Sequence, residues 1–300
     1  MKEVILMKNN EINIVMAINE AFIFPTRTTI ASIKRNKKEE LINIYILHFN
    51  ISNNGINLLE SDSTDSVSIK CIKINENDFP DFNICFEFSK EIMIKLFVHK
   101  YLPNELTKIV WLDSDLIVLG SLIDLYNYEI NNNYYVAYED QIIKKEYLEF
   151  IGFNQNYKYL NVGVMLINLK EIRNDSKFED NIKNCLNENY NIFSFTEQDL
   201  INTLYINKSV VIGYPHRFNR FVDKVHSNQI SKESISILHY QGFHQKPWKG
   251  CACRHYMLWW KYARTIKEYK PLFWKIMPTY IKNFIKKIFV KIALIFGIKK

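Results

Sequence analysis

Two aspartates separated by one residue come directly after an apolar stretch of the chain. Asp113 and Asp115 follow the segment KIVWL at residues 108–112 and precede a second apolar run, LIVLG. Carboxylates at positions i and i+2, at the carboxyl end of a strand, can share a hard cation whose other positions are filled by diphosphate oxygens. Taken alone, such a motif is more often a pair of turn-capping aspartates. The spacing still makes this segment the candidate site for Mg²⁺ or Mn²⁺.

The positions of the glycines argue against a glycine-rich phosphate-binding loop. The eight glycines are scattered along the chain, and they form neither a GxGxxG pattern nor a P-loop. Backbone amides of a glycine-rich loop are therefore not expected to bind phosphates. If a nucleotide diphosphate binds, another group must neutralise its phosphates.

The cysteines are odd in number and scattered, which suits a reducing compartment and argues against a disulfide framework. Cys251 and Cys253 lie close to His255, but their spacing and the lack of a second cysteine pair argue against zinc. We expect buried or inert thiols. The five cysteines are Cys71, Cys85, Cys185, Cys251 and Cys253.

The elements that must position these residues alternate between strands and helices. Apolar, β-branched runs at 12–18, 42–47, 67–74 and 108–112 alternate with helical patterns at 26–35 and 91–102. This alternation is typical of an α/β fold with a largely parallel sheet covered on both faces. Further strands are expected at 135–139, 159–169, 210–214 and 234–240, and further helices at 170–190 and 196–206.

The chain divides by composition near Gly250. We expect a catalytic domain at residues 1–250 and a helical, aromatic and basic segment at 251–300, in which Pro271 and Pro278 interrupt the helical pattern. After Glu268 there are eight lysines and no acids; subtracting these eight from the 39 basic residues leaves 31, against 32 acidic residues. Nearly all of the net charge of +7 is therefore in the tail.

The first 18 residues mix acids into an apolar stretch and lack a small-residue cleavage site. They fit neither a signal peptide nor a membrane anchor. The bulk of the chain is expected in the cytoplasm.

The segment VWLDSDLIVLGSLIDLY at 110–126 resembles the DxD region of the family 8 retaining glycosyltransferases, whose bacterial members include lipopolysaccharide galactosyl- and glucosyltransferases. Four further segments resemble family motifs in the same order, and together the resemblance covers about residues 11–250. It implies a GT-A type fold that binds a nucleotide sugar. The four segments are INIVMAINEAF, YLNVGVMLINLKEIR, FTEQDLIN and ILHYQGFHQKPWKG.

The resemblance implies a metal and phosphate site. Asp113 and Asp115 would be metal ligands together with His239, and an imidazole nitrogen favours Mn²⁺ over Mg²⁺ without excluding either. Lys246 would contact the diphosphate, and Gly242 would let the backbone approach the phosphates closely. Without the resemblance, His239 would be a core histidine and Lys-Pro-Trp a rigid surface turn.

The resemblance also implies a set of donor-binding residues. Asn161 and Gly163 would line the donor sugar, although Asn-x-Gly in a strand is also typical of a bulge, and Asp140 would contact sugar hydroxyls. Asn19 and Phe22 stand where the family commonly has Asp-x-x-Tyr, so Phe22 can still stack on uracil. Lys95 stands where the family usually has an arginine, and it cannot form a bidentate phosphate clamp. Ala17 and Ser114 complete the donor-binding set.

The mechanism implied by the resemblance centres on Gln198 and Asp199. An amide is a poor nucleophile, so we expect attack from the face on which the leaving group departs, with the oxocarbenium-like transition state stabilised by Gln198. Asp199 would bind the sugar. The bland alternative is a polar helix start capped by Thr196.

The tail combines lysines with apolar residues at helical spacing, and no uncharged run is long enough to span a bilayer. We interpret it as an interfacial helix that binds anionic lipid; the alternative is a helix packed on the domain with a solvated lysine face. Nucleic-acid binding is not expected, because the positive charge is confined to this tail. The apolar residues are Ile281, Phe284, Ile285, Ile288, Ile292 and Ile295.

Together these features predict a retaining, metal-dependent hexosyltransferase. Galactose or glucose would pass from a UDP-sugar to a saccharide or lipid-linked saccharide acceptor, in lipopolysaccharide or other surface-glycan synthesis. The enzyme would be peripheral on the inner face of the cell membrane. The rival hypothesis is an inactive sugar-binding or scaffold protein on a transferase fold.

Overall fold

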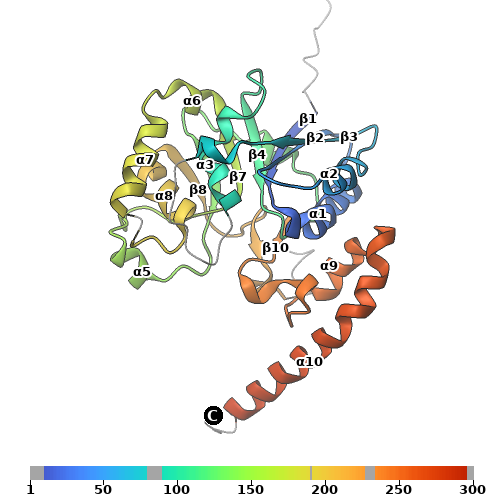
Figure 1. Cartoon of the computed structure of the whole chain (residues 1–300). Coiled ribbons are helices and arrows are strands. Elements are labelled where there is room, and N and C mark those ends of the chain that lie inside the picture. The colour runs from blue at the N-terminus through green and yellow to red at the C-terminus, as the bar shows by residue number, and fades with distance from the viewer. Residues whose placement is uncertain (1–9, 80–89, 190, 227–233, 296–300) are drawn as a thin grey trace, which may run out of the picture.

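A seven-stranded sheet forms the centre of the molecule (Figure 1). The computed structural model describes residues 10–79, 90–189, 191–226 and 234–295. The strand order is β3-β2-β1-β4-β7-β6-β8, and β7 alone runs antiparallel to its neighbours, β4 and β6. The predicted α/β fold is confirmed. The strands of this sheet are β1 (Glu11–Ala17), β2 (Leu41–His48), β3 (Val67–Lys73), β4 (Lys108–Leu112), β6 (Tyr135–Glu139), β7 (Leu160–Asn168) and β8 (Ser209–Ile212).

A second, three-stranded sheet lies beside the first. Its strands are β5 (Leu116–Val118), β9 (Arg220–Phe221) and β10 (Ile237–His239), in the order β5-β10-β9. Only residues 113–115 separate β4 from β5. The DxD segment is therefore the link between the two sheets.

Hydrophobic cores cover both faces of the large sheet. Successive strand residues alternate between them, so that Ile14 packs with the core of α1 (Ile23–Asn36) and α2 (Asn53–Glu60), whereas Val15 packs with the opposite core. Alternation of this kind is what a strand buried on both faces requires. The opposite core contains α3 (Ile94–Phe97), α7 (Phe178–Asn189) and α8 (Thr196–Tyr205). The remaining helices of the body are α4 (Ile123–Tyr126), α5 (Lys145–Phe150) and α6 (Leu169–Asn174), so the helix expected at 170–190 is divided between α6 and α7.

A third core joins the small sheet to the C-terminal region. Trp259 and Trp260 of α9 (Tyr256–Ala263) are fully buried, and they pack in one cluster with Leu238 of β10 and Phe273 of α10 (Lys270–Ile295). The chain beyond Gly250 thus begins as part of the globular body.

The final helix, α10, extends away from that body (Figure 1). The expected interruption at the two prolines is wrong, because α10 is one helix of 26 residues with Pro278 inside it. Pro271 is the second residue of the helix, where no intrahelical partner for an N–H is needed. Among the described residues, no helix is both long and apolar enough to cross a membrane.

Some sequence predictions concern residues outside this description. These are the expected absence of an anchor at residues 1–9, and the parts assigned to Cys85, Lys299 and Lys300. They stay predictions.

Candidate functional site

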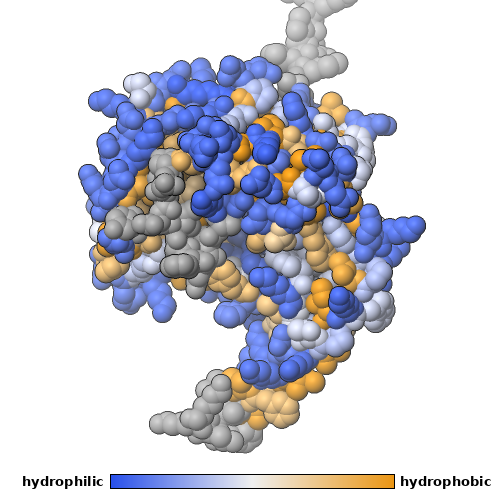
Figure 2. All heavy atoms as spheres, in the orientation of Figure 1, coloured by the Kyte–Doolittle hydropathy of each residue, from blue (hydrophilic) through white to orange (hydrophobic). Residues whose placement is uncertain are grey.

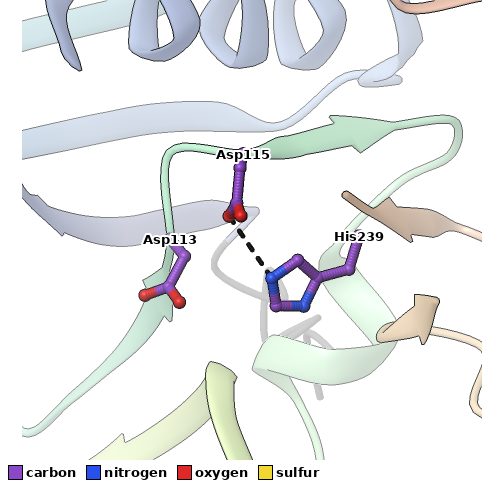
Figure 3. A group of neighbouring side chains, drawn as sticks. All are labelled: Asp113, Asp115 and His239. Carbon is purple, nitrogen blue, oxygen red and sulfur yellow. Dashed lines mark ion pairs between the residues drawn. The ribbon is translucent and has the colours of Figure 1, made fainter. Parts of the chain in front are cut away.

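Asp113, Asp115 and His239 form one group between the two sheets (Figure 3). One potential ligand atom from each lies within 4.8 Å of the others. The pairing of β5 with β10 places His239 opposite Leu116, and so beside Asp115. The distance from His239 Nε2 to Asp115 Oδ1 is 3.3 Å. Residues more than 120 positions apart in the chain thus meet through strand register.

The group fits a divalent cation. Two carboxylates and one imidazole match the preferences of Mn²⁺ and, less closely, of Mg²⁺. Gly163 of β7 leaves the space beside them open, because an added Cβ would lie 2.4 Å from His239 Cε1 and 3.0 Å from Asp113 Oδ2. In the described part of the chain, no other cluster of three such side chains has this spacing, and Cys251, Cys253 and His255 do not form one.

Two lysines balance the aspartates. Lys246 Nζ contacts Asp115 Oδ2 and donates to the Tyr240 carbonyl at 2.9 Å. Burial raises the pKa of Asp115, but the neighbouring Lys246 ammonium outweighs this effect and holds the pKa well below its ordinary value. Lys95 Nζ lies 3.3 Å from Asp113 Oδ1 and is itself buried. Both lysines singled out in the sequence are therefore at the site.

Glu197 also belongs to this centre, although the sequence analysis did not select it. Its carboxylate lies 3.6 Å from Lys95 Nζ and is buried. Burial raises the pKa of Glu197 to about 7, against the opposing effect of Lys95. Its place directly before Gln198 in FTEQDLIN was the signal that could have identified it.

Gln198, Asn161 and Asp140 form a buried hydrogen-bonded cluster beside the metal-ligating group. Asn161 Nδ2 donates to Asp140 Oδ2 at 2.9 Å and to Gln198 Oε1 at 3.1 Å. The Val162 N–H also donates to Gln198 Oε1, at 3.2 Å. The bulge expected as an alternative at Asn-x-Gly is present, because the register of β6 and β7 shifts between Ala137 and Tyr138.

Asp199 is not part of this cluster. It is fully buried, and its carboxylate accepts hydrogen bonds from the hydroxyls of Tyr147 and Tyr159 and from the Phe195 N–H. These contacts hold the start of α8, and the sugar-binding role expected for Asp199 stays a prediction. The alternative of a Thr196 cap is wrong, because the N-cap residue is Phe195, whose side chain makes no capping hydrogen bond.

Asn219 is a second residue that the sequence analysis missed. It is fully buried directly before β9, and it connects His239 Nδ1 to Asn161 Oδ1, with both distances at 2.8 Å. No motif in the sequence marks it. Its place follows from the pairing of β9 with β10.

The residues expected to bind the nucleotide lie around the end of β1. Ala17 ends this strand, and the Asn19 side chain caps the short 3₁₀ helix Glu20–Phe22 by accepting from the Ala21 N–H at 3.1 Å. Phe22 is half-buried. Its ring packs edge-on against that of Trp248, close to Lys246, with 6.4 Å between the ring centroids.

Ser114 and Gly242 complete the expected set. Ser114 is buried, and its carbonyl accepts from the Thr29 hydroxyl at 2.9 Å. Gly242 has a φ of 81°, with open space where a Cβ would lie. A side chain there would be strained by the backbone rather than by crowding.

Comparisons with known proteins agree on one family. The family model described as "Glycosyl transferase family 8" matches residues 13–252. A Haemophilus influenzae protein described as a glycosyltransferase is 28% identical over 250 residues, which are 80% of this chain and 74% of that protein. The lipopolysaccharide 1,2-glucosyltransferase of Escherichia coli K12 is 22% identical over 86% of this chain and 76% of its own length.

The fold is shared with a solved structure. The galactosyltransferase LgtC, crystallised with donor and acceptor sugar analogs, matches with a TM-score of 0.74 and 21% identity, over 87% of this chain and 100% of that one. The expected GT-A type fold is thereby confirmed.

Proposed function

The chain belongs to glycosyl transferase family 8, and from this premise we propose that it is a retaining, metal-dependent hexosyltransferase with a UDP-sugar donor. Galactose or glucose is the proposed hexose, since the relatives include a glucosyltransferase and a galactosyltransferase. The proposed acceptor is a saccharide or lipid-linked saccharide of lipopolysaccharide or another surface glycan. One observation carries most of the proposal: the group Asp113, Asp115 and His239 lies beside the buried cluster that contains Gln198.

In this proposal, Asp113, Asp115 and His239 hold Mn²⁺ or Mg²⁺. When bound, the ion supplies charge stabilisation to the diphosphate as UDP leaves. Lys246 and Lys95 add two positive charges close to the same carboxylates. As buried ammonium groups they stabilise a developing anion more strongly than they could in water.

Gln198 is proposed to stabilise positive charge on the sugar. Its carbonyl oxygen already accepts two hydrogen bonds, from Asn161 Nδ2 and from the Val162 N–H. Both lone pairs of that oxygen are therefore engaged, which disfavours its use as a covalent nucleophile. This supports attack by the acceptor on the face from which UDP departs, and so retention of configuration.

The donor is proposed to extend from this centre towards β1. Asp140, Asn161 and Gly163 would face its sugar, and Ser114 and Gly242 would lie near the phosphates. Ala17, Asn19 and Phe22 would contact the uridine. Glu197 is added to the donor side of this proposal, because it is buried next to Lys95.

The acceptor side is proposed to face an anionic membrane on the cytoplasmic side, with residues 251–300 as the attachment segment. Exposed apolar side chains along the outer part of α10 include Phe284, Ile288 and Phe289, and hydrophobic residues gather there in Figure 2. At the base of α10, Lys261, Arg264 and Lys270 line a hollow of about 370 Å³ with no acidic residue. This combination of apolar and basic side chains suits an interface with anionic lipid.

The proposal is tested by titrating UDP into the full chain with and without Mn²⁺, and by screening UDP-glucose, UDP-galactose and their N-acetyl forms for hydrolysis. Binding and turnover should require the metal and disappear in chelator. Asp113→Asn and Asp115→Asn should each lower activity by on the order of 100-fold or more, because several kcal/mol of charge stabilisation is lost.

Asp124→Asn is the matched control. Asp124 is an exposed aspartate paired with Arg217 at 2.8 Å, away from the group. It should keep wild-type activity. Full activity of wild-type protein in excess chelator would rule out the metal assignment.

A further inference from the structure

We infer that Asn219 is a positioning residue that fixes which nitrogen of His239 carries the proton and directs the other nitrogen at the metal site. This inference rests on the proposed function only in treating that site as a metal centre. A chain of hydrogen bonds, in which each donor and acceptor can be identified, connects Asn219 to His239 and to the backbone.

The chain starts at a group whose role is fixed. The backbone N–H of Gly163 can only donate, and it points at Asn161 at 3.1 Å. The atom of the Asn161 amide that faces it must be the oxygen. The Asn161 nitrogen then faces the Asp140 carboxylate at 2.9 Å, and a carboxylate is an acceptor. Both ends of this amide agree on its orientation.

The orientation of Asn161 determines that of Asn219. The Asn161 oxygen lies 2.8 Å from the terminal amide of Asn219, so the facing atom of Asn219 must be its nitrogen. The carbonyl oxygen of Asn219 is then directed at His239 Nδ1, also at 2.8 Å. An acceptor at this distance requires Nδ1 to carry a proton.

A neutral imidazole with a proton on Nδ1 has its lone pair on Nε2. That nitrogen faces Asp115 Oδ1 at 3.3 Å. The lone pair is therefore directed to where Asp113 and Asp115 would share a cation. Histidine ligands commonly have their second nitrogen fixed by such a partner.

Burial and backbone contacts keep this arrangement in place. Asn219, Asn161 and His239 are at most 3% exposed, so water cannot readily replace a lost partner. The backbone carbonyl of Asn219 accepts a hydrogen bond from Gln141 Nε2 at 2.7 Å, and the backbone N–H of Asn219 donates to the backbone carbonyl of His216 at 3.1 Å.

The test uses the full chain labelled with ¹⁵N-histidine. In metal-free protein at a pH where the ring is neutral, His239 should give the Nδ1–H pattern in long-range ¹H–¹⁵N spectra, with its signals identified by comparison with His239→Gln. Asn219→Ala should shift the ring towards the Nε2–H form. It should also weaken Mn²⁺ binding in the presence of UDP by about 10- to 100-fold.

Two variants separate positioning from general loss of structure. Asn219→Asp keeps an acceptor for Nδ1–H, so it should keep the wild-type tautomer and restore most of the Mn²⁺ affinity. Asn168→Ala removes a buried asparagine that bonds to the Asn131 carbonyl and the Glu171 N–H, away from His239. It should leave both readouts unchanged.

The outcomes distinguish the two proposals. An Nε2–H ring in wild-type protein overturns the inference, and so does an Asn219→Ala protein with the wild-type tautomer and Mn²⁺ affinity. If Asn219→Ala does not fold, the wild-type tautomer and Asn219→Asp decide. Wild-type protein with an Nδ1–H ring but no metal-dependent UDP binding would instead contradict the proposed function.

Discussion

Around Asp113 and Asp115, charge is balanced by individual side chains before any ligand is considered. Two neighbouring carboxylates repel each other unless cations offset their charge. Lys95 lies beside Asp113 and Lys246 beside Asp115. The two ammonium groups therefore offset the two negative charges, and Lys246 holds the pKa of Asp115 below its ordinary value.

Gln198→Ala should slow glycosyl transfer without abolishing it, because the amide is proposed to stabilise charge rather than to form a bond. A loss of about 10²- to 10³-fold is expected, as for removal of one preorganised dipole. Turnover and the anomeric configuration of the product by NMR are the measurements. A β-linked product, or a glycosyl adduct on Gln198, would contradict the assigned mechanism.

Glu197 should make the metal-free protein less stable as pH rises. Its pKa is raised from 4.5 to about 7 in the fold, so the folded state binds this proton more tightly than the unfolded chain does. The stabilisation is fully present below about 4.5 and is lost as pH rises towards 7. The slope is at most about 1.4 kcal/mol per pH unit for one proton.

Urea unfolding at several pH values from 5 to 8 checks this prediction. Glu197→Gln should remove the corresponding part of the slope, since the amide does not titrate. Equal slopes in the variant and the wild type would show that Glu197 is not protonated more readily in the fold.

At the scale of the elements, strand pairing assembles the site. Asp113 directly follows β4 of the large sheet, and His239 is the last residue of β10 in the small sheet. Gly163, on the bulged strand β7, lies between them. The closeness of Gly163 to the imidazole means that this position cannot accept even a methyl group without movement.

Gly163→Ala should therefore weaken Mn²⁺ binding in the presence of UDP by at least about 10-fold, because the ring of His239 must turn away. The control is Gly213→Ala, whose new Cβ would lie 2.7 Å from the flexible end of Lys158 and 3.6 Å, an ordinary contact distance, from Glu139 Oε2. Isothermal titration of both variants is the check. Equal affinities would show that the imidazole is free to adjust.

The sequence predicts much of this arrangement, but not all of it. Apolar runs gave the strands, and two carboxylates at a strand end marked the DxD segment. The meeting of His239 with Asp115 depends on pairing between distant strands, which no local pattern encodes; only the family resemblance suggested it. Asn219 and the inward orientation of Asp199 depend on packing alone. The interruption expected at Pro278 is wrong, because a proline removes one helical hydrogen bond but does not always end the helix.

At the scale of the whole molecule, α10 changes character along its length. Phe273 is buried in the third core. The ring of Tyr280 stacks on that of Tyr256 with 3.7 Å between the ring centroids, and Asn283 Nδ2 donates to the Gly250 carbonyl at 2.9 Å. From Phe284 to Ile292 every residue is exposed. The inner part is packed on the body, whereas the outer part is exposed and contacts the body through Lys287 Nζ, which donates to the Ala252 carbonyl at 2.9 Å.

A chain ending at Asn283 should therefore keep its fold and its Mn²⁺-dependent UDP binding but lose most binding to anionic vesicles. The cut removes Lys286, Lys287 and Lys291 together with Phe284 and Phe289, and each lysine near such a surface contributes about 1 kcal/mol. Cosedimentation with phosphatidylserine vesicles at low and high salt is the measurement. Salt should weaken the binding of the full chain.

Two results would contradict the membrane assignment. One is a shortened chain that sediments as well as the full chain does. The other is a full chain that binds neutral and anionic vesicles equally, since the lysines would then contribute nothing.

Helix α10 continues through Pro278 without a turn, and this continuity affects how such enzymes can diverge. Because the inner part of α10 shares a core with β10, which carries the proposed metal ligand His239, recombination near Gly250 would separate β10 from the helices that pack on it. Recombination beyond Asn283 would exchange a stretch whose residues 284–292 are all exposed. The outer part of α10 is thus the segment that evolution or protein engineering could exchange. Under the proposed function, such an exchange would change the surface to which the enzyme attaches without changing its product.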